Sequence, residues 1–180
     1  MENKKELKLG YKIALIICLV LVLANSVVEV IVMTDVNLNI AFPIIGLLSL
    51  LAALYYAFFG YKKPHGNLLK NVFFVHALLS AAFIVFVSKT FPQYIIAINL
   101  FRVVLIAFMA GRLNKFKQNI VIIAIVGMCS FIYGVCYLTI RDMSVITLFK
   151  GFSPFISWAT LSITYLSRYE AHTEAGLADK

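Results

Sequence analysis

Acidic residues are scarce in this chain, and charged residues of either sign are few. Of its 180 residues, 8 are Asp or Glu, and all charged residues together make up 13%. Soluble domains have about 25% charged residues and about 45–50% apolar ones. With 62% hydrophobic residues, the chain carries more apolar surface than a domain of this length buries in water. The composition excludes an ordinary soluble domain and predicts a polytopic integral membrane protein.

Cysteine is also sparse, and the three cysteines form no motif. Cys18, Cys129 and Cys136 lie within apolar stretches, and no Cys-x-x-Cys pair is present. A thiol in such a stretch behaves as a small hydrophobic side chain. We therefore expect neither a disulfide framework nor a bound metal or cofactor.

Catalytic motifs are missing as well. The sequence has no His-Glu-x-x-His zinc motif, no phosphate-binding loop and no Gly-x-Ser-x-Gly elbow. The residues from Gly151 to Ser153 resemble the start of the Gly-x-Ser-Gly motif of rhomboid proteases. Pro154 stands at the fourth position, however, and no histidine lies in a later helix to act as base. We therefore expect a protein that is not an enzyme.

Six apolar stretches are long enough to cross a membrane, which takes about 20 residues each. They cover residues 12–34, 38–60, 69–89, 92–112, 119–140 and 145–167. The first stretch is too long for a signal peptide and no Ala-x-Ala cleavage site follows it, so we expect it to remain as a helix. The predicted fold is all-α: one integral membrane domain over residues 1–180, a bundle of six transmembrane helices.

Basic residues give the chain a net charge of +8 and predict its orientation. They lie in short clusters between the apolar stretches, not on one face of a domain, which excludes a nucleic-acid partner. Twelve fall on one side of the predicted membrane and three on the other: Lys4, Lys5, Lys8, Lys12, Lys62, Lys63, Lys70, Arg112, Lys115, Lys117, Arg168 and Lys180, against Lys89, Arg141 and Lys150. The richer side of a membrane protein is cytoplasmic. We therefore expect both termini in the cytoplasm and the bundle in a bacterial plasma membrane.

Two charged residues within the stretches are the first candidates for function. Arg102 lies near the middle of the fourth stretch, and Glu29 lies in the outer half of the first, where its alternative place is the outer headgroup region. A charge at such a depth costs at least about 2.5 kcal/mol, so it faces the bundle interior and usually has a partner. Asn25 shares a helix face with Glu29, and Asn99 shares one with Arg102. We predict two opposed polar faces that form a site for a polar or charged small molecule, or an ion-coupled gate. Alternatively, they form a buried pair that fixes helix packing.

The sixth stretch carries a stripe of hydroxyl residues. Ser153, Ser157, Thr160 and Thr164 recur at helical spacing, with Trp158 nearby. Gly151 and Pro154 should disturb the outer end of this helix, because proline donates no backbone hydrogen bond. The stripe predicts one wall of a cavity that opens to the outside, with Lys150 at its mouth. Alternatively, small hydroxyl residues mark close helix packing.

Three residues of other stretches complete the prediction. Tyr133 is expected to add an aromatic wall to the cavity. Gly134, spaced four residues after Ser130, favours a close helix contact. His76 is expected to be an interior residue that forms a hydrogen bond; the alternative is a group that titrates near neutral pH or accepts a proton. The predicted ligand-binding residues are therefore Asn25, Glu29, Asn99, Arg102, Tyr133, Ser153, Ser157 and Trp158.

In size, helix number and topology the chain resembles the substrate-binding membrane subunits of energy-coupling-factor vitamin transporters. Those subunits carry an Ala-x-x-x-Ala contact surface on their first helix, and Ala14 with Cys18 stands at the nearest equivalent here. The resemblance implies a ligand bound near the outer face and membrane and ATPase partner subunits. We expect a small-solute binding or transport protein. The alternative is a non-catalytic structural or regulatory subunit of a membrane complex.

Overall fold

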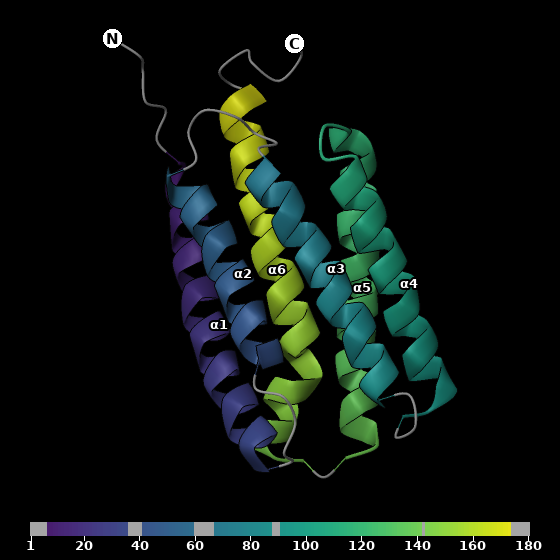
Figure 1. Cartoon of the computed structure of the whole chain (residues 1–180). Helices are drawn as coiled ribbons and strands as arrows, with labels where there is room; N and C mark the ends of the chain where they lie inside the picture. The colour runs from purple at the N-terminus through teal and green to yellow at the C-terminus, as the bar shows by residue number, and fades with distance from the viewer. Residues whose placement is uncertain (1–6, 36–40, 60–66, 88–90, 142, 174–180) are drawn as a thin grey trace.

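The computed structural model describes residues 7–35, 41–59, 67–87, 91–141 and 143–173. Within these ranges the chain is all-α and has six helices (Figure 1). They are α1 (Leu9–Asp35), α2 (Ala41–Phe59), α3 (Asn67–Val87), α4 (Gln93–Gly111), α5 (Phe116–Thr139) and α6 (Val145–Thr173). An all-helical chain with six helices in the predicted order is confirmed for the described residues, whereas six membrane spans stay a prediction. Of the basic residues used to predict the orientation, six lie outside the described residues: Lys4, Lys5, Lys62, Lys63, Lys89 and Lys180.

The helices form a ring in which each one contacts the next along the chain. α6 closes the ring against α1 and also contacts α2. The first turn of α1 and the last turn of α6 lie at the same end of the bundle (Figure 1). At that end the side chain of Lys8 donates a hydrogen bond to Glu170.

Four helices are long and apolar enough to cross a membrane. Their candidate spans are Leu9–Ile31, Asn67–Val85, Gln93–Gly111 and Phe116–Thr139, and α2 has a shorter apolar stretch, Pro43–Phe59. Only 22–33% of the residues in these four spans are buried, and every one of the four has large apolar side chains exposed on the outside of the bundle. Ile16, Leu78, Val104 and Met128 are examples of exposed apolar side chains in these spans. Such an outer surface suits lipid and supports an integral membrane protein.

α6 is the helix that departs from this pattern. It is absent from the candidate spans, and its buried residues include Thr160, Ser162, Thr164, Ser167 and Arg168. Figure 1 shows α6 in the middle of the bundle, and its neighbours are α1, α2 and α5. A helix enclosed by other helices accepts polar residues that a lipid-facing helix rejects.

Two details of α6 differ from the sequence-based expectation. The helix runs without a break through Gly151 and Pro154, so neither residue ends it. It also continues to Thr173, six residues beyond the predicted limit at 167. Ser167 and Arg168 are buried against the bundle, and this packing carries the helix past the apolar stretch.

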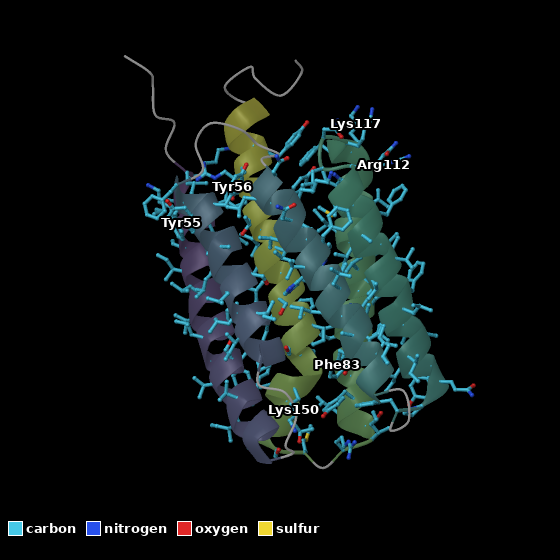
Figure 2. All side chains as sticks on the ribbon, viewed as in Figure 1. Tyr55, Tyr56, Phe83, Arg112, Lys117 and Lys150 are labelled. Carbon is cyan, nitrogen blue, oxygen red and sulfur yellow. The ribbon has the colours of Figure 1, made fainter. Side chains whose placement is uncertain are left out.

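Basic side chains are unevenly divided between the two ends of the bundle. Figure 2 shows Arg112 and Lys117 at the end where α1 begins, and Lys150 at the opposite end. Lys8, Lys70 and Lys115 belong to the first end, because α1, α3 and α5 begin there (Figure 1). The described part of the chain therefore has one strongly basic end, as the sequence predicts.

Candidate functional site

A closed triangle of polar side chains joins α1 to α6. The Asn25 amide donates from Nδ2 to Glu29 Oε1 at 2.9 Å and to Ser153 Oγ at 3.0 Å. Ser153 Oγ donates in turn to Glu29 Oε1 at 2.6 Å. Asn25 is buried and Glu29 is half-buried, while Asn25 Oδ1 has no hydrogen-bond partner. We call these three residues the α1–α6 triad.

The spacing of the triad follows from helix geometry. Asn25 and Glu29 are four residues apart, so their side chains lie on one face of α1. Ser153 belongs to the hydroxyl stripe of α6, the helix that packs against α1. The sequence predicted the Asn25–Glu29 face and the hydroxyl stripe separately. The structure shows that Ser153 of the stripe meets that face of α1.

A second polar group lies on the other side of the bundle, between α4 and α5. Arg102 Nη1 donates to Asn99 Oδ1 at 2.5 Å. Arg102 is 3% exposed and Asn99 is 5% exposed, so this cation is enclosed by protein. Arg102 Nε has no hydrogen-bond partner. One neutral amide oxygen is therefore the only acceptor that the described residues provide to this guanidinium.

Tyr133 and His76 also lie near Arg102. Tyr133, which is 2% exposed, interacts with both Asn99 and Arg102. His76 on α3 lies close enough to interact electrostatically with Arg102, and its Nδ1 is 3.5 Å from Ser49 Oγ. Arg102, Asn99 and Tyr133 form what we call the Arg102 cluster.

The predicted opposition of Glu29 and Arg102 is wrong in this structure. Glu29 accepts hydrogen bonds from Asn25 and Ser153 and forms no ion pair with Arg102. Among the described residues, the ion pair that forms joins Lys8 and Glu170. α1 packs on α2 and α6, whereas α4 packs on α3 and α5. The two charges therefore sit in separate groups, because the ring order places their helices on different sides of the bundle.

Trp158 and Ser157 do not join either group. The Trp158 indole donates from Nε1 to the backbone oxygen of Ile123 at 3.0 Å and meets Phe73 edge-on, with ring centroids 5.9 Å apart. It belongs to the main apolar core, whereas Tyr133 belongs to a separate apolar cluster with Ile95 and Tyr137. Ser157 is half-buried, and in the described part of the chain its hydroxyl makes no hydrogen bond.

Sequence reasoning missed two buried polar residues near the basic end. Asn119 was placed at a helix boundary, yet it is 0% exposed and bonds to Arg112 and Tyr165. The sequence places Arg168 among the basic residues of the cytoplasmic side, and in the structure its side chain is 2% exposed. The hydroxyl stripe of α6 could have indicated that Arg168 is buried, because Thr164 precedes it by four residues on the same helix face.

A surface hollow lies at the basic end of the bundle, among the described residues. It has a volume of about 250 Å³, is open to solvent and is lined by residues 114–118 and Tyr169. Most of these residues belong to the connection from α4 to α5 and the first turn of α5, and Figure 2 labels one of them, Lys117, close to Arg112. The predicted cavity around Trp158 remains a prediction.

The contact surface implied by the transporter resemblance is partly covered. Cys18, the second residue of the Ala14–Cys18 pair, is buried with Leu15 in a small apolar cluster against Leu54 and Ala57 of α2. A partner helix would therefore meet a surface from which Cys18 is withdrawn.

The chain matches no known family model, and no curated protein and no solved structure shows significant similarity to it.

Proposed function

We propose that this chain binds or transports a small anionic solute within a membrane bundle, and that Arg102 binds the anion. The observation that carries the proposal is the enclosed guanidinium with a single neutral acceptor at Asn99. No carboxylate among the described residues lies within ion-pair distance of Arg102. An unbalanced charge at this depth costs several kcal/mol, so a bound anion would stabilise the protein.

The chemistry of the Arg102 cluster favours a carboxylate or a phosphate. A guanidinium offers five N–H donors in a planar fork, and such anions accept two parallel hydrogen bonds from it. Arg102 uses one donor on Asn99 and leaves Nε available. The Tyr133 hydroxyl and the Asn99 amide would provide neutral hydrogen bonds to the rest of the solute. The proposal assigns no catalytic step to any residue.

The proposed topology is six spans with both termini in the cytoplasm of a bacterial plasma membrane. The basic end of the bundle supports it, because that end contains the start of α1 and the end of α6. Arg102 follows the start of α4 by nine residues, so it would lie about 14 Å from the outer end of that helix. Since the cluster is buried, entry of a solute requires α4 to rock or tilt against its neighbours.

A finer version makes the chain the substrate-binding subunit of a multi-component transporter. The likeness in size and helix number to energy-coupling-factor subunits supports this version by analogy. The sequence contains no phosphate-binding loop, so energy would come from a partner ATPase. Purification in mild detergent should then recover an ATPase with the chain, whereas transport by the chain alone in liposomes would favour a secondary carrier.

The anion proposal is tested by thermal unfolding of the purified chain with a panel of small carboxylates and organic phosphates. A bound anion at about 100 times its Kd raises the free energy of unfolding by about 2.7 kcal/mol. Arg102→Met keeps much of the volume and removes the charge, so it should abolish the shift. Arg112→Met is the matched control, because Arg112 is exposed at the basic end with its guanidinium over the Phe108 ring.

The stability of Arg102→Met without solute separates a binding role of Arg102 from a role in helix packing. An enclosed charge kept for binding is a cost to the empty protein, so its removal should leave stability unchanged or higher. If no anion shifts the wild type and Arg102→Met is strongly destabilised, Arg102 fixes helix packing and the proposal fails.

The second candidate is a structural or regulatory subunit of a membrane complex. The closed hydrogen bonds of the α1–α6 triad favour it, because they already hold two helices together. Cysteine labelling separates the candidates: with the native cysteines replaced, a Cys at Ser157 should react with a water-soluble maleimide if a cavity opens. A sealed bundle leaves it unreactive.

A further inference from the structure

The hollow at the connection from α4 to α5 lies apart from the α1–α6 triad and the Arg102 cluster. Its volume is about 250 Å³, it is open to solvent, and its lining is Asn114, Lys115, Phe116, Lys117, Gln118 and Tyr169. Aromatic stacking fixes one wall, since the rings of Phe116 and Tyr169 are nearly parallel with centroids 3.6 Å apart. Because this stack joins α5 to α6, two packed helices determine the shape of the hollow.

The lining of the hollow contains two cations and no anion. Lys115 and Lys117 are both exposed, and Figure 2 shows Lys117 at the basic end of the bundle. The sequence has no Asp or Glu from residue 36 to residue 141, so α2 to α5 bring no carboxylate to this place. Within the described part of the chain, the carboxylate at this end is Glu170, which pairs with Lys8. The charge of the hollow therefore suits an anion from outside the chain.

Backbone donors add to the positive charge of the two lysines. Lys115 is the N-cap residue of α5, and no side chain caps this helix. The amide N–H groups of residues 116–118 form no backbone hydrogen bond among the described residues. The first turn of a helix carries the positive end of its dipole, and its free N–H groups bind anions. These donors therefore reinforce the preference for an anion that the lysines of the hollow already provide.

The position of the hollow selects the kind of anion. The candidate membrane spans of α4 and α5 are Gln93–Gly111 and Phe116–Thr139, so the hollow lies where both spans end. Next to it, α5 presents an apolar outer surface: Ile120 and Val121 are 44% and 57% exposed. They follow Lys117 by three and four residues, which places them on the same helix face. A cationic hollow thus continues into a surface suited to hydrocarbon, and a lipid needs both whereas a soluble anion needs only the first.

We propose that the hollow binds the phosphate group of an anionic phospholipid, whose acyl chains lie along the apolar face of α5. Basic pockets between membrane helices bind acidic lipid headgroups. Lys115 and Lys117 donate charge-assisted hydrogen bonds to the phosphate, and the first-turn amides of α5 donate to its remaining oxygens. Because Tyr169 belongs to α6, the bound lipid also stabilises the packing of α5 on α6.

The lipid site is independent of the proposed solute site. Arg102 precedes the last residue of α4 by nine residues, which is about 14 Å along the helix. Failure of either proposal therefore leaves the other untouched.

The test is thermal unfolding of the full-length chain in a neutral detergent with added phosphatidylglycerol, compared with the same amount of phosphatidylcholine. We expect phosphatidylglycerol to raise the Tm by about 2–4 °C more than phosphatidylcholine, and this difference to shrink at high salt. The double variant Lys115→Gln/Lys117→Gln should lose most of the difference. Lys12→Gln/Lys70→Gln is the matched control, because it removes the same charge from the same end and neither residue lines the hollow.

A second variant tests the hollow separately from its charge. Gln118 is exposed and lines the hollow, so Gln118→Trp fills the space and keeps both lysines. It should greatly reduce the phosphatidylglycerol-specific shift, whereas Gln118→Ala, which fills nothing, should retain it.

Three outcomes would overturn the lipid site. The first is an equal shift with the two lipids. The second is an equal loss of the shift in both double variants, which would mean that the lipid responds to the overall charge of the basic end. The third is the same lysine-dependent shift with inorganic phosphate alone, which would mean that the hollow binds a free anion. If the double lysine variant does not fold, Gln118→Trp decides alone, and an unchanged phosphatidylglycerol shift in it refutes the site.

Discussion

Gly134 of α5 and Gly151 of α6 pack backbone against backbone. A Cβ atom on Gly134 would lie 3.1 Å from the carbonyl oxygen of Gly151, and one on Gly151 would lie 3.2 Å from the carbonyl oxygen of Gly134. The two helices approach this closely because neither residue has a side chain. The Ser130–Gly134 pair in the sequence predicted a close contact here, and Gly151 is its partner. This crossing fixes the turn of α6 that precedes Ser153.

We predict that Gly134→Ala destabilises the protein by about 1–3 kcal/mol, as overpacking does. The added methyl group would also lie 2.8 Å from Phe152 Cε1. The Phe152 ring would have to move to relieve this contact, and its packed surroundings limit that movement. Gly127→Ala is the control on the same helix, because its Cβ would be 3.8 Å from Trp158 and alanine favours a helix. Thermal unfolding in one detergent compares the two variants. Equal stability of both would refute the tight crossing.

Asn119 is predicted to anchor the connection from α4 to α5. Its amide donates to the Arg112 carbonyl at 2.8 Å and to Tyr165 Oη at 2.9 Å, and Tyr165 donates to the Leu113 carbonyl at 2.7 Å. Asn119→Ala should cost about 1–3 kcal/mol, because it leaves buried polar groups unpaired. A double-mutant cycle with Tyr165→Phe should give a coupling of at least about 0.5 kcal/mol. Additive effects would show that the two side chains act separately.

Trp158 is the single tryptophan of the chain and is 3% exposed. Its fluorescence should be insensitive to acrylamide in the folded protein and become quenchable on unfolding. Trp158→Phe should lower stability by about 1 kcal/mol through the lost bond to Ile123. Equal quenching before and after unfolding would mean that water reaches Trp158 in the folded state, as the predicted cavity requires.

Acid should weaken the contact between the ends of α1 and α6. The hydrogen bond from Lys8 holds the pKa of Glu170 below its ordinary value, which is about 4.3. A carboxyl whose pKa is lowered on folding adds stability above its unfolded pKa, and this stability is lost as pH falls through the lower folded value. The side chains are partly exposed, so the effect is small and salt reduces it.

Thermal unfolding of wild type and Glu170→Gln between pH 3 and pH 6 measures this contribution. The wild type should lose more stability than the variant below about pH 4.3, and the two curves should converge at the acidic limit. Lys8→Gln should behave like Glu170→Gln, because either change removes the pair. Parallel curves at all pH values would contradict it.

The helices could be predicted from the sequence because a membrane-spanning segment is defined by local composition. A helix of about 20 consecutive apolar residues crosses the membrane and forms its backbone hydrogen bonds within itself, so it needs no particular neighbour to form. The end of α6 was missed for the same reason: Ser167 and Arg168 look like a solvated boundary, and only their burial against other helices extends the helix.

The sequence by itself determined the class of fold, the six helices and the residues that carry polar groups into the bundle. The tertiary structure alone decided which of these meet: Glu29 with Asn25 and Ser153, and Arg102 with Asn99. Helical periodicity places a residue on a face of its own helix, but it does not say which helix that face will meet. That choice follows from the ring order, with α6 beside α1 and α4 beside α5, and it separates the two charges that the sequence suggested would pair.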